Sequence, residues 1–228
     1  MPGVILLYSR YRDSTNIVTK DYQTTAEALV TAGQFLAEKG WAPATSGNYS
    51  ARLDGEQVAI TVSGRDKGRL VVDDIMVVDF AGHPITPDKK ASAETLLHTS
   101  LYRQYPFTGA VLHTHSIDCV TLSRWLLKQG KDHLLLTNYE LMKALPGITT
   151  HAAELLIPIV PNSQEMVSLG KDVLDRLSPL SHPVGYIIAG HGLYAWGATM
   201  PQALMATEAL EVLISCALKE LFLEQGRP

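Results

Sequence analysis

Two histidines, His113 and His115, stand on either side of a single threonine. In a β-strand, residues two positions apart point to the same face, so both imidazoles would converge there. Neutral imidazole is a common ligand for zinc and other first-row metals. A polar strand end explains the same spacing equally well, so the pair alone does not decide between the two interpretations.

His191 is a candidate third ligand, because the glycines on both sides of it permit a close approach of the backbone. Three histidines with an open fourth position are typical of a catalytic zinc site rather than a closed structural one. Taken alone, however, the segment favours a tight turn between two strands. His151 also competes for the third place, and the sequence does not exclude it.

Two carboxylates and two short loops give weaker signals. Glu94 stands at the start of an expected helix, where the helix dipole favours an acidic residue, and Glu140 has the character of a surface charge. The loops over 45–48 and 63–67 contain glycine and serine, and such loops can offer backbone N–H groups and hydroxyls to a phosphate. Most Ser-Gly turns bind nothing.

The elements around these residues are expected to alternate between helices and strands. Asn162, with Glu165 three residues later, predicts the start of a helix. Its inner face would carry Met166, Val173, Leu174 and Leu177. An Asp-Gly pair at 54–55 predicts a hairpin. We expect helices over 25–39, 92–104 and 116–128, a last helix carrying the apolar series Met205, Ala209, Val212, Leu213, Cys216 and Ala217, and strands over 48–53, 57–62, 75–80, 109–114, 155–160, 184–189 and 193–196.

This pattern predicts a three-layer α/β or α+β domain around a mostly antiparallel sheet. Residues 1–23 are interpreted as an N-terminal arm and residues 24–228 as a single domain, a usual size for one core.

Composition excludes several classes of protein. Lys plus Arg number 19 and Asp plus Glu number 23, which gives a net charge of -4 with no basic block, so a nucleic-acid partner is not expected. No apolar run approaches the roughly 20 residues of a membrane-spanning helix. Two cysteines, Cys119 and Cys216, are too few for a disulfide framework, which favours the reducing cytoplasm.

Five short motifs, taken in their order along the chain, resemble the class II aldolase family. They are Gly47-Asn48-Tyr49-Ser50, Ser63-Gly64, Ser92-Ala93-Glu94, His113-Thr114-His115-Ser116 and His191-Gly192. The resemblance covers nearly the whole chain, from about residue 24 to about residue 223. It implies an α/β/α sandwich, commonly assembled as a homotetramer with active sites at subunit interfaces.

The resemblance also assigns roles to individual residues. It implies one zinc ion per subunit, bound by His113, His115 and His191. It further implies a pocket for the phosphate group of the substrate. The residues of that pocket would be Gly47, Asn48, Ser63, Gly64 and Ser92.

Within the family, the chain is similar to the branch of methylthioribulose-1-phosphate dehydratases, which act in methionine salvage. The segments 139–143, 150–151, 157–162 and 191–197 carry this similarity. It implies a cytoplasmic, zinc-dependent enzyme that dehydrates 5-methylthioribulose 1-phosphate to 2,3-diketo-5-methylthiopentyl 1-phosphate. The branch implies Glu140 as the acid/base of dehydration, and Glu94 matches the base of the aldolases and would be a second carboxylate at the metal. The sequence does not decide which of the two glutamates is the main acid/base.

Two alternatives stay open. A class II sugar-phosphate aldolase or epimerase would use the same zinc and phosphate sites. Against aldol cleavage, Ala93 stands where such aldolases often carry a second serine, and residues 218–228 contain no tyrosine to donate a proton. The other alternative is a non-catalytic interaction module similar to the adducin head, which retention of all three histidines disfavours.

Overall fold

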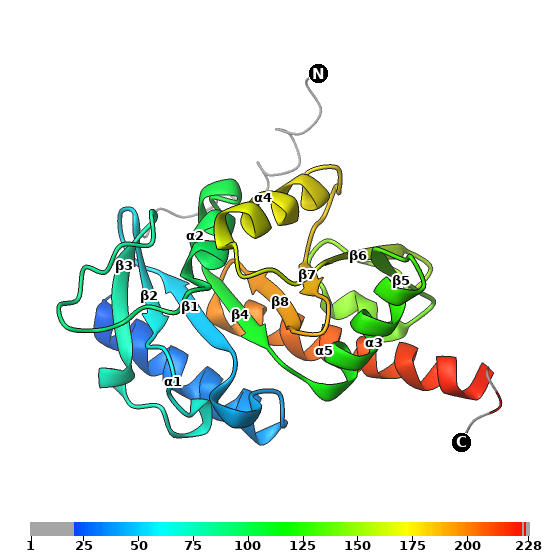
Figure 1. Cartoon of the computed structure of the whole chain (residues 1–228), viewed down its shortest axis with the longest axis horizontal. Helices are drawn as coiled ribbons and strands as arrows, with labels where there is room; N and C mark the ends of the chain where they lie inside the picture. Colours follow the sequence, from blue (N-terminus) through cyan, green and yellow to red (C-terminus); the bar gives the residue numbers. More distant parts are fainter. Residues whose placement is uncertain (1–20, 225, 227–228) are drawn as a thin grey trace.

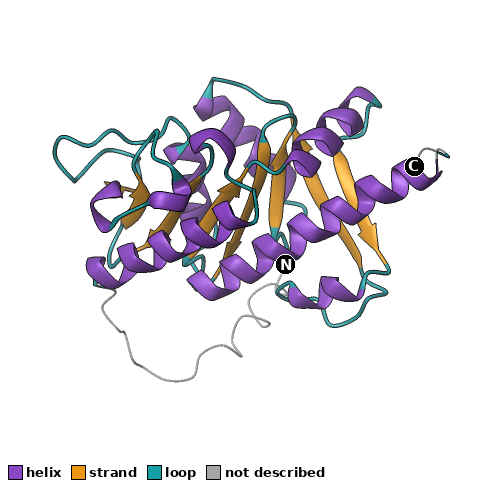
Figure 2. Ribbon diagram, turned by 90° about the horizontal axis from the view of Figure 1, so that it is seen from below, coloured by secondary structure: helices purple, strands orange, loops and turns teal. Residues whose placement is uncertain are grey.

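The computed structural model describes residues 21–224 and residue 226, so the arm expected over 1–23 lies almost wholly outside the described residues. An eight-stranded sheet runs through the molecule with helices on both faces (Figures 1 and 2). Its order is β3-β2-β1-β4-β8-β7-β6-β5, and within the described chain every neighbouring pair is antiparallel except β6 with β7. The strands are β1 (Asn48–Arg52), β2 (Gln57–Thr61), β3 (Ile75–Asp79), β4 (Ala110–Thr114), β5 (His133–Thr137), β6 (Glu154–Val160), β7 (Gly185–Ile188) and β8 (Gly192–Gly197).

Helices α1 (Tyr22–Glu38), α3 (Ile117–Lys128) and α5 (Met200–Glu224) cover one face of the sheet. Helices α2 (Thr95–Gln104) and α4 (Met166–Leu177) cover the other face (Figure 1). Each layer buries apolar side chains against the sheet, which is the largest favourable term in folding. The three-layer α/β/α sandwich around a mostly antiparallel sheet, expected from the sequence, is confirmed.

The central strand β4 is buried on both faces. All five of its residues are buried; Val111 packs in the core under α2 and α4, whereas Leu112 packs in the core under α1. A strand between two helical layers has apolar side chains on both sides. His113 therefore lies at the end of a strand that packing holds from both faces.

The structure contains a strand that the sequence analysis did not predict, β5, at one edge of the sheet. Leu134 and Leu136 are buried, whereas Leu135 is exposed, so the strand alternates as a half-buried strand should. Three identical leucines in a row give no alternation in the sequence, which is why the pattern was not visible there.

The prediction that Asn162 caps a helix is wrong. Helix α4 begins at Met166, and Glu165, in the N-cap position, makes no capping hydrogen bond with its side chain. The side-chain oxygen of Asn162 lies instead 3.4 Å from Nδ1 of His191. The asparagine that follows β6 thus contacts the turn between β7 and β8 rather than a helix end.

The last helix, α5, is longer than the apolar series that predicted it, and the series is only partly buried. Ala209 and Leu213 are buried, whereas Met205 and Val212 are 47% and 40% exposed. The sheet-facing side of α5 also carries a buried carboxylate, Glu211. Among the described residues no helix, α5 included, combines the length and apolar character needed to cross a membrane.

Candidate active site

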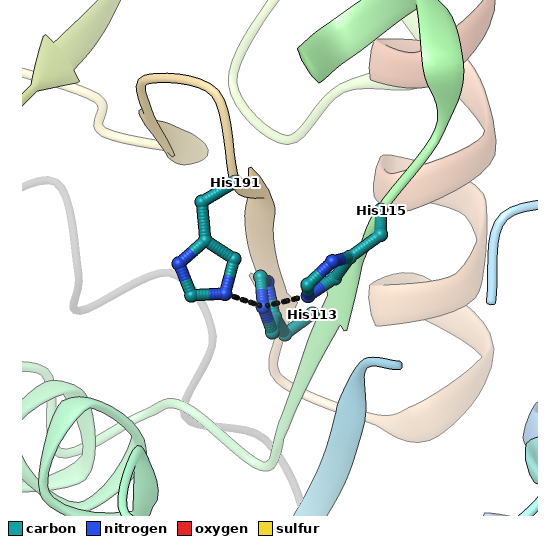
Figure 3. A group of neighbouring side chains, drawn as sticks. All are labelled: His113, His115 and His191. Atoms are coloured by element: carbon teal, nitrogen blue, oxygen red, sulfur yellow. Dashed lines mark hydrogen bonds between the residues drawn. The ribbon is translucent and has the colours of Figure 1, made fainter. Parts of the chain in front are cut away.

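The three histidines predicted as metal ligands meet at one end of the central strands (Figure 3). His113 and His115 come from the end of β4, and His191 comes from the turn between β7 and β8. Nε2 of His113 lies 2.8 Å from Nε2 of His115 and 3.3 Å from Nε2 of His191. The three candidate ligand atoms all lie within 4.8 Å of one another, as three ligands of one ion would.

The glycines beside His191 make this approach possible. Gly190 has a φ of +69°, a conformation that glycine adopts without strain. A Cβ atom on Gly192 would lie 1.9 Å from the carbonyl oxygen of Thr114, which no side chain can tolerate. The turn therefore lies against the end of β4 only because both neighbours of His191 are glycines.

Hydrogen bonds orient the rings of two of the histidines. Nδ1 of His113 donates to the carbonyl oxygen of Leu193 at 2.9 Å, and the ring stacks on Tyr194 with centroids 3.9 Å apart. This bond fixes the tautomer of His113 and leaves a lone pair on Nε2, facing the other two rings. Nδ1 of His191 faces the amide oxygen of Asn162.

Two of the histidines, His113 and His115, are neutral, which is the form of imidazole that binds a metal ion. Burial lowers the pKa of His113 well below its ordinary value. Burial and the neighbouring His191 lower the pKa of His115 to about 4. Both imidazoles are therefore neutral near pH 7, and their facing nitrogens fit a divalent metal ion.

Glu94 places a carboxylate against this cluster. It precedes α2, and its Oε1 lies 2.9 Å from Nε2 of His191 while its Oε2 lies 3.6 Å from Nε2 of His113. The side-chain amide of Asn48 and the hydroxyl of Tyr194 donate to Oε2. Burial opposes ionisation of Glu94, but the bonds with His191 and Asn48 and the field of His113 outweigh it, so its pKa lies well below the ordinary value.

A cavity of about 260 Å³ opens beside the histidines and Glu94. Every residue that the sequence analysis assigned to phosphate binding lines it. The lining consists of Thr45, Ser46, Gly47, Asn48, Thr61, Val62, Ser63, Gly64, Lys67, Ser92, Ala93, Glu94, His115, Gln164, Met166 and His191. The hydroxyl of Ser46 is buried and finds no hydrogen-bond partner in the described part of the chain, so the wall retains an unused polar group.

Lys67 is a residue of this cavity that the sequence analysis missed. Its side chain is buried, and Nζ donates to the carbonyl oxygens of Thr45 at 2.8 Å and Arg65 at 2.6 Å, one from each loop. Burial lowers the pKa of Lys67 to about 8, which leaves it mostly charged at neutral pH. The lysine joins the two Gly/Ser loops and adds a positive charge to the wall; its place four residues after Ser63 was the available signal.

Glu140 lies far from this site within the same chain. It begins a short 3-10 helix, η5 (Glu140–Ala144). The strands β6 and β7 end at the edge of the sheet where β8 begins and where the histidines lie. The start of β6 is therefore at the opposite edge, and there Glu154 pairs with Thr137, the last residue of β5. The helix η5 follows Thr137, beyond the opposite end of the sheet, and β5 is four strand spacings, roughly 19 Å, from β4.

The surroundings of Glu140 are those of a surface residue. Its side chain is 70% exposed, forms an ion pair with Lys143 and lies 3.8 Å from Nδ1 of His151. His151, the competing candidate for third ligand, is thus at the far end of the sheet from His113 and His115, and within one chain it does not join them.

The chain has clear relatives. The family model for the Class II Aldolase and Adducin N-terminal domain matches residues 27–218. Methylthioribulose-1-phosphate dehydratase from Marinobacter nauticus is 50% identical over 200 residues, 88% of this chain and 95% of that protein. The protein of the same name from Pseudomonas aeruginosa is 50% identical over 199 residues, 87% of this chain and 96% of its own length.

Solved structures share the fold. YgbL from Klebsiella pneumoniae superposes with a TM-score of 0.71 at 26% identity, covering 86% of this chain and 88% of that one. L-Fuculose-1-phosphate aldolase from Thermus thermophilus gives a TM-score of 0.70 at 24% identity, covering 91% of this chain and 100% of that one. By its family match and by its relatives, the chain belongs to the class II aldolase and adducin N-terminal domain family.

Proposed function

We propose that this protein is a hydro-lyase that converts 5-methylthioribulose 1-phosphate to 2,3-diketo-5-methylthiopentyl 1-phosphate in methionine salvage. The observation that carries the proposal is a cluster of three histidines and Glu94 beside a cavity lined by two Gly/Ser loops. It occurs in a chain 50% identical, over most of its length, to methylthioribulose-1-phosphate dehydratases.

We propose His113, His115 and His191 as the ligands of one divalent cation per subunit, and zinc as that cation. The donor set fits, because one imidazole nitrogen from each of three histidines lies within 4.8 Å of the others and Glu94 contributes an anionic oxygen nearby. When bound, such a cation acts as a Lewis acid on the oxygens next to the reacting carbons.

The phosphate end of the substrate is assigned to the part of the cavity wall that the two Gly/Ser loops and Ser92 form. This part offers backbone N–H groups and hydroxyls, and its residues are Gly47, Asn48, Ser63, Gly64 and Ser92. The charge of Lys67 and the unpartnered hydroxyl of Ser46 add to its capacity for an anion. These groups orient the substrate so that its C2 ketone and C3 hydroxyl approach the histidines.

The chemical steps follow from the two carboxylates. The ionised carboxylate of Glu94 accepts the proton on C3, which is acidic because it is next to the C2 ketone, and the electron pair forms a C2–C3 double bond. As the C2 carbonyl re-forms, the pair moves to C3–C4 and the C4 hydroxyl leaves with a proton from a second acid. The resulting C3 enol takes up a proton at C4 and becomes the diketone.

We propose Glu140 of a neighbouring subunit as that second acid. Within one chain Glu140 lies beyond the other end of the sheet and is 70% exposed, so it can reach a histidine cluster only across an interface between copies. The family's usual homotetramer, with active sites at subunit interfaces, provides such an interface.

The Glu140→Gln variant is expected to lose about 100-fold in turnover, the usual contribution of one positioned acid, while metal content stays unchanged. Co-expression with His115→Ala tests the interface. A mixed oligomer forms some sites with intact histidines from one copy and an intact Glu140 from another, and should recover up to about a quarter of wild-type activity if copies mix at random. Near-normal turnover of Glu140→Gln alone, or no recovery on mixing, would contradict this role.

The function itself is tested by mass spectrometry of the products from 5-methylthioribulose 1-phosphate. An intact carbon chain that has lost one water is the expected result. Two carbon fragments would mean aldol cleavage, and an isomer of unchanged mass would mean epimerisation. An unchanged substrate with protein that contains no metal would favour a non-catalytic module.

We also propose that the protein works in the cytoplasm. Its two cysteines are both free thiols; Cys119 is buried and Cys216 is half-buried. Free thiols are typical of a reducing compartment.

A further inference from the structure

Glu211 is a buried carboxylate that the proposed mechanism does not use. It lies on the sheet-facing side of α5, is 2% exposed and does not line the cavity. One of its oxygens accepts a hydrogen bond from the hydroxyl of Thr114 and the other from the hydroxyl of Ser116. These two residues stand immediately before and after His115, so a single carboxylate holds both sides of that histidine.

The hydroxyl of Ser116 forms one hydrogen bond as acceptor and one as donor, and the donated one goes to Glu211. Its hydroxyl oxygen accepts from the backbone N–H of Cys119 at 3.1 Å and so caps the start of α3, which leaves the hydroxyl proton free for Glu211. Glu211 therefore connects three elements at one point: α5, the end of β4 and the first turn of α3.

His115 needs support of this kind more than the other two histidines do. The ring of His113 donates to a backbone carbonyl, and the ring of His191 faces the amide of Asn162. Nδ1 of His115 has no partner among the described residues; the bond that fixes this residue directly runs from its backbone N–H to the carbonyl oxygen of Trp41, at 2.8 Å. The position of its ring thus depends on the backbone that carries it.

Packing does not explain a carboxylate at this place. The neighbouring α5 residues Leu210, Leu213 and Ile214 are buried and apolar. Burial raises the pKa of Glu211 to about 7, a sign that the site disfavours the charge. Burying a carboxylate costs free energy that its hydrogen bonds must offset. What Glu211 adds is two directed hydrogen bonds to the segment around His115.

We propose that Glu211 is a positioning residue that holds His115 in the geometry required for metal binding. The inference rests on the metal site of the proposed function. Residues that orient ligands without touching the ion typically change metal affinity by about 10- to 100-fold when they are removed. We therefore expect the effect of Glu211 to appear in the metal site itself and not only in the rate.

The test compares cobalt-substituted and zinc-loaded whole protein. Glu211→Ala should change the intensity and shape of the visible cobalt(II) bands and weaken zinc binding, measured by competition with a chelator, by about 10-fold or more. Glu211→Gln retains an acceptor oxygen and should recover most of both signals. Should Glu211→Ala not yield folded protein, Thr114→Val removes one of the two bonds at constant size, and Thr114→Ser should restore it.

Thr207→Val is the matched control. Thr207 is also buried on α5, one turn before Glu211, but its hydroxyl bonds to the backbone of its own helix. The control should leave the cobalt bands and the zinc affinity as in the wild type, even if it lowers stability. Unchanged bands and affinity in folded Glu211→Ala or Thr114→Val would overturn the proposal for Glu211, whereas a wild type that binds neither ion would contradict the metal site.

Discussion

Replacing His113 with alanine is expected to empty the metal site and to lower turnover by about 10⁴-fold, because Lewis-acid stabilisation of several kcal/mol is lost. His113 is the central member of the cluster, since its Nε2 is within 3.3 Å of both partners. It is also buried, and its bond to the carbonyl oxygen of Leu193 fixes the orientation of its ring. His115→Ala is expected to have the same effect. Metal content after dialysis and product formation measured by mass spectrometry would check both.

His133→Ala is the control for this change. His133 lies on β5 at the edge of the sheet, is partly exposed and pairs with Asp132. The control should keep full metal content and turnover. Stoichiometric zinc in dialysed His113→Ala would show that the ion binds elsewhere and would contradict the proposed ligand set.

The second large effect is expected for Glu94→Gln, with turnover reduced by about 10³-fold while the metal remains bound. The amide has nearly the shape of the carboxylate and can keep contacts to Asn48 and Tyr194, so the three histidines should stay in place. It cannot accept the C3 proton, however, because an amide oxygen is far less basic than a carboxylate. Single-turnover measurement of C3 proton exchange with solvent, together with metal analysis, separates the loss of the base from the loss of the ion.

Glu154→Gln provides a matched loss of charge at an exposed position at the other end of the sheet. It should leave both proton exchange and metal content unchanged. If Glu94→Gln still exchanged the C3 proton at a near-normal rate, Glu94 would not be the base, and the role would pass to another group.

The histidine pair could be predicted from the sequence because its two members are close together in the chain. Two residues on one strand share a face, so His113 and His115 could be paired from spacing alone. His191 is 78 residues from His113 in the chain, and its approach depends on the register of β4 with β8 and on the contact between Gly192 and Thr114. Local sequence patterns reveal neither the strand register nor this contact. The resemblance to a family was what distinguished His191 from His151.

Other parts of the site were hidden because burial cannot be read from residue type. Lysine and glutamate are usually exposed, so residue type did not mark Lys67 or Glu211 as buried, and only the place of Lys67 in the 63–67 loop pointed to it. The edge strand β5 was missed because its leucines conceal the alternation. Conversely, Asn162 matched the pattern of a helix cap, but contact with His191 across the fold determines its place.

The pairing of β4 with β8 also bears on how the protein folds. The three histidines approach one another only after strands that carry residues 78 positions apart have joined at the centre of the sheet, so we expect the site to form in the late, non-local part of assembly. An ion that binds there stabilises the native state without helping to nucleate it. Bound metal should therefore slow unfolding and leave the folding rate almost unchanged, so that the ion extends the lifetime of the native state rather than speeding its formation.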